Sequence, residues 1–231
     1  MKFAFLCREP LYSSRKRIAI IGAGPAGLTA AGYLACRGYE IDVYDKLPYP
    51  GGLMTFAIPR HRISLEEIFD GWRDLEDNFG VEFHFRTKIS AGSGWDEGDE
   101  FVEKVLDLLE LSKSYDGVIV ATGTWKSRRL GIEGEDAKNV VTALNFLYRR
   151  RLEELKLLSG NGFQSFGRAV IIGAGLSAVD AAEECLSMGM KEVYVTYRRS
   201  IREAPAGGYR IRELIRSGVR WVELVQPRRI I

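Results

Sequence analysis

The chain has 231 residues, of which 46% are hydrophobic and 28% charged, and its formal net charge is +2. This length and composition are ordinary for a folded protein of one large or two small domains. A net charge so close to zero gives no long-range field for nucleic acid or an anionic membrane, and no apolar run reaches the length of a membrane span. The N-terminus is too polar for a signal peptide, so we expect a cytoplasmic protein.

Cysteines and histidines give no sign of a redox-active dithiol or a metal centre. Cys7, Cys36 and Cys185 stand far apart without a C-x-x-C pair, so neither a catalytic dithiol nor an iron–sulfur ligand run is expected. His61 and His84 are the only histidines, and no metal-ligand spacing surrounds them. We therefore expect no bound metal.

The first clear element is a glycine-rich strand-to-helix turn. Residues 1–16 are a basic lead-in without periodicity, either a docking arm or a poorly ordered end. An apolar run over 17–21 predicts a buried parallel strand, and an alanine-rich segment over 28–36 predicts a helix. The G-x-G-x-x-G spacing between them lets a backbone approach a pyrophosphate at a helix N-terminus. The residues expected to contact these phosphates are Gly22, Gly24, Pro25, Ala26 and Gly27.

The next strand decides how this turn is interpreted. By itself a G-x-G-x-x-G pattern is weak, because a glycine-rich turn that binds nothing has the same sequence. A second strand over 40–44 completes a βαβ unit and ends at Asp45, where a carboxylate can accept hydrogen bonds from a ribose. This context favours dinucleotide binding.

A loop and a long helix follow. Residues 46–54 are turn-rich and are expected to be neither helix nor strand. Their paired glycines would let backbone N–H groups approach a ligand closely, although an isolated Gly-Gly would mean only a loop. Ser64, with Glu67 three residues later, is typical of a capping box, and it predicts a helix over 65–79 whose apolar stripe faces a core.

Strands and loops alternate through the rest of the first half. Residues 81–85 alternate as a strand, with 88–89 at its far end, and 90–98 are a glycine- and serine-rich surface loop. Residues 101–111 are helical in period. Residues 117–123 predict another buried strand that ends in a small, glycine-bearing turn, which would point at the same crevice as the first turn.

The second half repeats the opening pattern. We place a domain boundary near residues 125–134, followed by a charged amphipathic helix over 141–158 and a flexible connector over 160–167. Residues 168–178 then repeat the arrangement of 17–28 almost residue for residue. Two nucleotide modules in one chain are a much sharper signal than one.

The second module differs from the first where the ribose would lie. A helix over 177–188 and a strand over 192–197 complete it, with Ala178 in place of the third glycine. Two arginines follow this strand in place of an acid, and a guanidinium pair can grip a 2′-phosphate in charge-assisted bonds. The alternative is two surface arginines at a strand end. We therefore expect NADP rather than NAD on Gly173, Gly175, Leu176, Ser177, Arg198 and Arg199.

With both modules placed, the chain resembles the flavin- and pyridine-nucleotide-dependent oxidoreductases, and most closely the small subunit of NADPH-dependent glutamate synthases. The stretches that carry the resemblance are residues 21–31, 50–53, 57–59, 121–123, 131–135, 173–175 and 197–200. The resemblance implies FAD on the first module and NADPH on the second, which is inserted into the first. On the FAD side it implies Gly22, Gly24, Gly27, Asp45, Lys46, Gly51, Gly52, Leu53, Ile89, Ala121, Thr122 and Gly123.

Two departures from the family's pattern set the expectation for partners. The family's N-terminal, cysteine-rich iron–sulfur domain is missing, so any iron–sulfur relay must lie in another polypeptide. The family also returns to the FAD domain after the NADPH domain, whereas this chain stops at Ile231 after a strand-like segment over 219–225. Both sheets would then have unpaired edges, which proteins normally cover. We expect either a partner subunit that supplies the remaining strands or a truncated chain.

The sequence thus predicts an α/β fold with two Rossmann-like, three-layer dinucleotide-binding modules, the second following the first and incomplete at its C-terminus. The expected parts are an N-terminal arm over 1–16, the N-terminal part of a FAD domain over 17–130, and the first half of an NADPH domain over 131–231. We expect an oligomer with a partner subunit, and neither nucleic acid nor membrane as a partner.

The leading functional hypothesis is a flavoprotein oxidoreductase subunit that passes hydride from NADPH to FAD and electrons onward to a partner or acceptor. We name no catalytic acid, base or nucleophile, because hydride transfer needs none and the sequence has no Ser/His/Asp or Cys/His set. The alternative is a non-catalytic dinucleotide-binding or assembly subunit of a larger redox complex. A dehydrogenase with a covalently handled small substrate has little support.

Overall fold

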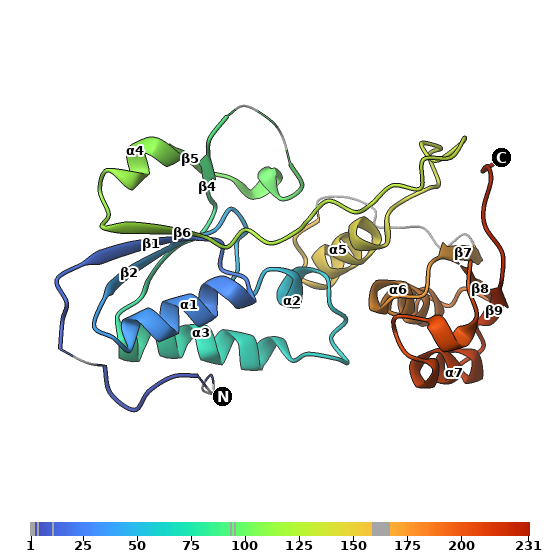
Figure 1. The fold of residues 1–231 in the computed structure, drawn as a ribbon, viewed down its shortest axis with the longest axis horizontal. Helices are drawn as coiled ribbons and strands as arrows, with labels where there is room; N and C mark the ends of the chain where they lie inside the picture. Colours follow the sequence, from blue (N-terminus) through green and yellow to red (C-terminus); the bar gives the residue numbers. More distant parts are fainter. Residues whose placement is uncertain (1–2, 4, 11, 93, 95, 159–166) are drawn as a thin grey trace. The chain divides into compact units, whose positions relative to one another are not determined.

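The computed structural model describes residues 3, 5–10, 12–92, 94, 96–158 and 167–231 (Figure 1). Of the connector predicted over 160–167, all but the last residue lies outside the described residues. The chain divides into two compact units, Met1–Trp125 and Lys126–Ile231. Each unit has its own parallel sheet with helices packed on it, so the predicted α/β fold is confirmed.

A parallel sheet in the order β3-β2-β1-β6 forms the centre of the first unit. Its strands are β1 (Arg17–Ile21), β2 (Glu40–Tyr44), β3 (Glu82–His84) and β6 (Gly117–Val120). Since β1 pairs in parallel with both β2 and β6, the carboxyl ends of these three strands meet at one end of the sheet. The first two strands have the bounds predicted from their apolar runs, because parallel strands in a sheet centre are buried.

Two helices lie along one face of this sheet, α1 (Pro25–Ala35) and α3 (Leu65–Phe79) (Figure 1). The helix predicted over 65–79 is confirmed with its N-cap, because the Ser64 hydroxyl accepts a hydrogen bond from the Glu67 N–H at 3.4 Å. Helix α1 begins three residues earlier than predicted, since Pro25 fits the first helical turn. The core between these helices and the sheet includes Ile20, Leu28, Val43 and Leu75.

The other face of the sheet carries a small substructure. Strands β4 (Thr87–Ser90) and β5 (Lys104–Asp107) pair in parallel as a separate sheet, and α4 (Leu108–Ser112) follows. Residues 88–89 therefore do not extend the neighbouring strand as predicted, because Arg86 has a φ of 55° and turns the chain out of the main sheet. The substructure packs on the main sheet through Ala19, Tyr44, Ile89, Leu106 and Leu111.

The helix predicted over 101–111 is wrong. This stretch contains the end of a 3-10 turn (Asp99–Phe101), then β5, and only then α4. Pairing with β4 holds the middle of the stretch extended despite its helical period. Asp107 then starts α4, since its side chain accepts the N–H groups of Leu109 and Glu110.

The loop over 46–54 contains one element that the sequence did not predict. Helix α2 (Leu53–Phe56) forms a single turn directly after the paired glycines. The buried Thr55 hydroxyl donates to the carbonyl of Pro50 at 2.5 Å, which ties this turn to the start of the loop. A stretch predicted to be irregular from its glycines and prolines is therefore fixed by a hydrogen bond between its own residues.

The second unit is built on a parallel sheet of the strands β7 (Arg168–Ile172), β8 (Glu192–Tyr197) and β9 (Arg220–Glu223), in the order β7-β8-β9. Helix α6 (Leu176–Ser187) packs against β7 and β8 and against the helices α5 (Ala143–Glu154) and α7 (Gly208–Arg216). A 3-10 turn (Ile201–Glu203) lies between β8 and α7. The strand predicted over 192–197 is confirmed. The helix predicted over 141–158 is shorter at both ends, and its start is set by the Thr142 hydroxyl, which accepts the N–H of Asn145.

Candidate cofactor-binding sites

The first glycine turn is a close crossing of backbone segments from β1, β6 and α1. Gly22 follows β1 with a φ of 108°, a conformation that favours glycine. A Cβ at Gly22 would lie 2.4 Å from the carbonyl oxygen of Ala121, which follows β6. A Cβ at Gly27 would lie 1.8 Å from the carbonyl oxygen of Gly22, so α1 rests directly on the turn. The N-terminus of α1 is thereby fixed against the carboxyl ends of two strands.

A second glycine segment lies against the first. The Gly51 N–H donates to the carbonyl of Ala23 at 2.7 Å, and a Cβ at Gly52 would lie 3.0 Å from the Cα of Gly24. Gly24 is the N-cap of α1, and no side chain caps the helix there. Among the described residues, the N-terminus of α1 and the positive end of its dipole therefore lack a side-chain cap, an arrangement that suits a phosphate.

Asp45 braces the first turn with both carboxylate oxygens. Its Oδ2 accepts the N–H of Ala23 at 2.7 Å, and its Oδ1 accepts the N–H of Leu47 at 2.8 Å. Burial raises the pKa of Asp45, while the two backbone hydrogen bonds oppose that rise. Each carboxylate oxygen has two lone pairs, so acceptor capacity remains for a ribose hydroxyl beside the turn. The bracing contact to Ala23 was missed because it joins residues 22 positions apart.

The structure brings only part of the predicted FAD set together. The contacts above join the glycines of both segments with Asp45 and with residues 121–122. Lys46 is engaged elsewhere, because its ammonium pairs with Asp99 at 3.1 Å. Ile89 packs on the face of the sheet away from α1, in the small cluster with β5 and α4.

The second unit has a turn of the same form. Gly173 follows β7 with a φ of 130°, and Gly175 is the N-cap of α6, again without a side-chain cap. A Cβ at Gly175 would meet no atom within 4 Å. Ala178 stands where the first turn has Gly27, and its Cβ lies 3.9 Å from the Cβ position of Gly173, an ordinary contact. The substitution predicted to be tolerated therefore fits. Leu176 and Ser177, the first residues of α6, are exposed.

The strand registers show which residues correspond between the units. The N–H of Gly22 donates to the carbonyl of Tyr44, and the N–H of Gly173 donates to the carbonyl of Thr196. Counting forward from these carbonyls, Tyr197 corresponds to Asp45 and Arg198 to Lys46. Arg198 and Arg199 are both exposed, and neither forms an ion pair with another described residue.

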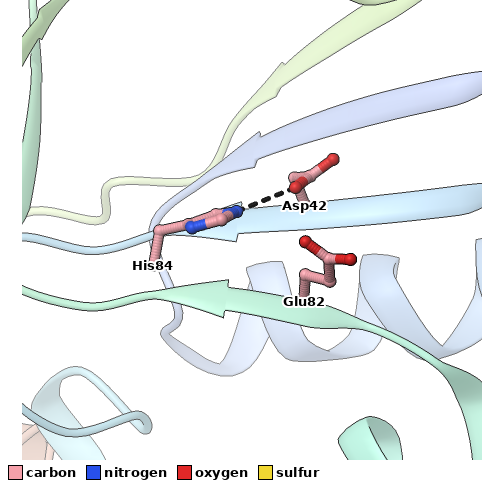
Figure 2. Close-up of side chains that lie close together, drawn as sticks. All are labelled: Asp42, Glu82 and His84. Carbon is pink, nitrogen blue, oxygen red and sulfur yellow. Dashed lines mark hydrogen bonds and ion pairs between the residues drawn. The ribbon is translucent and has the colours of Figure 1, made fainter.

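A charged cluster on the first sheet was not predicted (Figure 2). Asp42 is 5% exposed, and its carboxylate contacts the Arg17 guanidinium at 2.9 Å and His84 Nε2 at 2.8 Å. Ligand atoms of Asp42, Glu82 and His84 lie within 4.8 Å of one another, and these residue types can bind a metal ion. The Arg17 guanidinium already neutralises Asp42, however, so the cluster is explained as a clamp across β1, β2 and β3.

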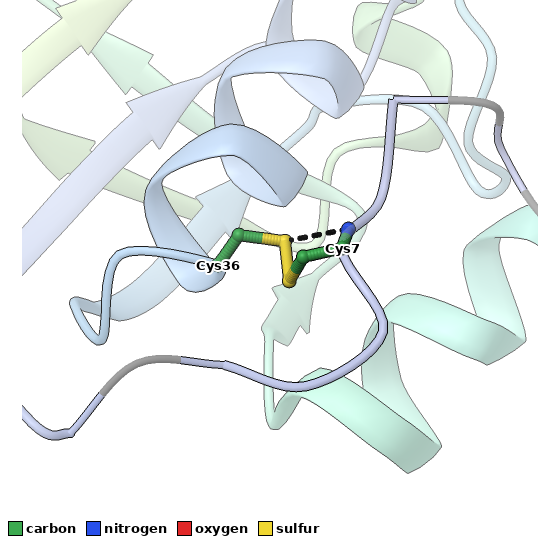
Figure 3. Close-up of a disulfide and its surroundings, with 2 residues drawn as sticks. All are labelled: Cys7 and Cys36. Atoms are coloured by element: carbon green, nitrogen blue, oxygen red, sulfur yellow. Dashed lines mark hydrogen bonds between the residues drawn. A yellow bond between two sulfur atoms is a disulfide. The ribbon is translucent and has the colours of Figure 1, made fainter.

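A disulfide was also not predicted. Cys7 and Cys36 are bonded with a Cα–Cα distance of 5.9 Å, while Cys185 is buried as a free thiol (Figure 3). The spacing of the three cysteines along the chain carries no signal for this pair, because the bond joins residues 29 positions apart. It lies at the end of α1 opposite the glycine turn.

Comparison with known proteins identifies related sequences along almost the whole chain. A family model described as pyridine nucleotide-disulphide oxidoreductase matches residues 16–231. NADP(+)-dependent formate dehydrogenase subunit beta from Moorella thermoacetica is 33% identical over 221 residues, covering 95% of this chain and 28% of that protein. Glutamate synthase [NADPH] small chain from Escherichia coli K12 is 33% identical over 220 residues, covering 92% of this chain and 43% of that protein. The chain thus spans less than half the length of these relatives.

Solved structures share the fold. FprA, an oxidoreductase of Mycobacterium tuberculosis, matches with a TM-score of 0.71 at 20% identity, over 94% of this chain and 61% of that one. Thioredoxin reductase of Lactococcus lactis matches with a TM-score of 0.56 at 22% identity, over 94% of this chain and 67% of that one. Together with the family match, these findings confirm the resemblance predicted from the motifs. In the described part of the chain, no helix has the length and apolarity needed to cross a bilayer.

Proposed function

Because the chain belongs to the pyridine nucleotide-disulphide oxidoreductase family, we propose that it passes hydride from NADPH to FAD and electrons onward to a partner or acceptor. The family binds FAD and NAD(P)H, and these cofactors supply the redox chemistry while the protein supplies position and electrostatics. The observation that carries the proposal is the uncapped N-terminus of α1 beside a strand-end glycine turn, repeated at α6 in the second unit.

The first unit fits a dinucleotide. A Cβ at Gly22 or Gly27 would overlap neighbouring backbone, so the glycines keep the turn tight enough for a pyrophosphate to reach the N–H groups of α1. We propose that Asp45 holds this turn in shape and accepts a hydrogen bond from a ribose hydroxyl with its remaining lone pairs. The residues proposed for FAD are Gly22, Gly24, Pro25, Ala26, Gly27, Asp45, Gly51, Gly52, Leu53, Ala121, Thr122 and Gly123. Lys46 and Ile89 are proposed with less support, since other contacts engage their side chains.

The second unit fits a phosphorylated dinucleotide because of its unpaired positive charge. Lys46 shares the carboxylate of Asp99 with Lys88 at the end of the first module, whereas the corresponding Arg198 forms no ion pair with any described residue. A 2′-phosphate would therefore meet a guanidinium that has no carboxylate partner among the described residues, and Arg199, which interacts electrostatically with Glu203, adds a second one. The residues proposed for NADPH are Gly173, Gly175, Leu176, Ser177, Arg198 and Arg199.

We also propose that the chain acts within a larger assembly. The relatives that the chain matches are named as a subunit or a chain. On β6 and β7, strands at the edges of their described sheets, Val120 is 65% and Val170 is 60% exposed. Further strands would cover these edges. The domain limits proposed are 17–130 for FAD and 131–231 for NADPH.

An absorbance spectrum tests the proposal most directly. The purified protein should be yellow, or become yellow on reconstitution with FAD, and NADPH should bleach the flavin band under anaerobic conditions. The matched control is the Arg198→Ala/Arg199→Ala double variant, which should keep the flavin band and lose its response to NADPH at low concentration. A colourless protein that takes up no FAD would refute the proposal.

The second candidate is a non-catalytic subunit that holds a dinucleotide while a partner performs the redox step. The observation that favours it is that these relatives are named as a subunit or a chain. Stoichiometric FAD that NADPH does not reduce, in material shown by mass analysis to be the lone chain, would support this candidate over the first.

A further inference from the structure

The described residues of the N-terminal arm, 3 and 5–10, lie against the two helices of the first unit. The Phe3 ring fills a notch at Gly71 of α3, where a Cβ would lie 2.4 Å from the ring. Phe5 and Leu6 fill a second notch at Gly32 of α1, where a Cβ would lie 2.5 and 2.7 Å from their side chains. Because both helical positions are glycine, the side chains of the arm can lie directly against the helix backbones. Any larger side chain at these two positions would overlap the arm.

Side-chain packing and one covalent bond hold the arm. Its described residues form no helix or strand; Phe3 and Leu6 pack against the core of the first unit, while Phe5 is 39% exposed. The disulfide from Cys7 to Cys36 fixes the arm to the C-cap of α1, and the Cys7 N–H points at Cys36 Sγ at 3.0 Å (Figure 3). A segment without helix or strand hydrogen bonds opens more readily when the covalent bond that fixes it is broken.

The disulfide lies at the surface of the first unit. Cys7 and Cys36 are both only partly buried. Each is followed by an exposed arginine, Arg8 or Arg37, and the Arg37 guanidinium stacks on the Tyr33 ring. The third cysteine, Cys185, is buried, belongs to the other unit, and has a pKa raised by burial to about 11.

The disulfide stands outside the proposed cofactor site. It lies at the C-terminal end of α1, whereas the glycine turn lies at the N-terminal end of the same helix. An 11-residue helix separates the two ends by about 16 Å, at 1.5 Å per residue. We therefore take an external dithiol as the reductant.

We propose that Cys7 and Cys36 form a reversible redox switch that fastens the arm over α1 and α3 when oxidised and releases it when reduced. A dithiol reductant donates two electrons and two protons to the Cys7–Cys36 bond, which becomes two thiols while the reductant becomes a disulfide. Release uncovers the apolar notches at Gly32 and Gly71. The inference concerns the arm alone and does not depend on the proposed electron transfer.

Thiol counting and limited proteolysis test the switch on the full chain. After denaturation, maleimide should label one thiol in the oxidised protein and three after dithiothreitol, whereas Cys185→Ser should show none and two. Chymotrypsin should cut after Phe5 or Leu6 about tenfold faster in reduced protein, because the arm then opens freely. Oxidised glutathione should restore the slow rate.

Two variants separate a switch from a static staple. Cys7→Ser changes only the arm, so it should fold and be cut at the fast rate with or without reductant. Cys185→Ser keeps both switch cysteines and should respond to reductant like the parent protein. Three labelled thiols under oxidising conditions would overturn the proposal. Equal cleavage rates in the oxidised and reduced states, or a disulfide that excess dithiothreitol leaves intact in the native protein, would overturn it as well.

Discussion

The contact between Gly27 and the carbonyl of Gly22 predicts a large effect from a single methyl group. In Gly27→Ala the new Cβ would lie 1.8 Å from that oxygen, and real Cβ contacts are essentially never shorter than 3.0 Å. Helix α1 and the turn must therefore separate by more than 1 Å. Overpacking of this kind costs about 1–3 kcal/mol, and replacing a helical glycine returns up to about 1 kcal/mol. We expect a net loss of about 1–2 kcal/mol from these two terms.

The second turn provides the matched control for this variant. Ala178 already occupies the corresponding position at an ordinary contact distance, so Ala178→Gly relieves no clash. It should lose helix propensity, about 1 kcal/mol, and the burial of one methyl group, about 0.8 kcal/mol, and leave the turn unmoved. The two variants exchange the same methyl group at equivalent positions, which separates the close approach at the first turn from a general effect on the helix.

Thermal unfolding and FAD titration measure the two consequences. Gly27→Ala should lower the melting temperature by about 2–8 °C for a chain of this size. It should weaken FAD binding by about tenfold or more, because the N–H groups aimed at the pyrophosphate move with the helix. Unchanged FAD affinity and melting temperature in Gly27→Ala would refute the reasoning. An equal loss of FAD affinity in Ala178→Gly would refute it too.

Three further predictions concern charge. Arg198→Ala/Arg199→Ala should raise the NADPH concentration needed for half-maximal flavin reduction by about tenfold or more. The NADH concentration needed should stay unchanged, since only NADPH has a 2′-phosphate. Equal changes for both cofactors would contradict this prediction. Burial raises the pKa of Asp99, but hydrogen bonds from two lysines outweigh this effect and lower it. The stabilisation that Asp99 contributes is therefore present at pH 7 and is lost as the pH falls through the lowered pKa. In urea unfolding, Asp99→Asn should therefore be less stable than the parent at pH 7, and the difference should shrink at acid pH; a constant difference would contradict this. Arg17→Met should lower the free energy of unfolding by about 1–3 kcal/mol, because the buried Asp42 loses a charged partner. An unchanged midpoint of urea unfolding would show that the Arg17–Asp42 contact does not stabilise the sheet.

Local signals in the sequence were enough for the elements that surround the glycine turns. The strand before Gly22 is a continuous apolar run, and the helix over 65–79 begins at Ser64, whose hydroxyl accepts the N–H of Glu67 three residues later. In such cases the residues that decide the structure are neighbours along the chain. The hydrophobic period and the caps then agree with the final fold.

The errors occur where distant residues decide. The stretch over 101–111 has a helical period, but pairing with β4 makes part of it a strand. The clamp at Asp42 joins three strands, and the disulfide joins the arm to the far end of α1. The sequence around each of these residues is the same whether or not the distant contact forms. Such contacts can therefore be identified only from the folded structure.

The distinction between neighbouring and distant residues also bears on ligand selection by the two similar glycine turns. Both turns are completed by a backbone bond from a later loop, from Gly51 to Ala23 in the first unit and from Ala206 to Ala174 in the second. Because backbone groups make these bonds, the two loops can differ in sequence while the turns remain alike. We propose that selection between ligands falls to the side chains just beyond the second strand of each module. There Lys46 of the first unit shares the carboxylate of Asp99 with Lys88, and the second unit leaves Arg198 exposed and without an ion pair among the described residues. A distant residue, Asp99, therefore offsets part of the positive charge in the first unit, and no described residue does so for Arg198.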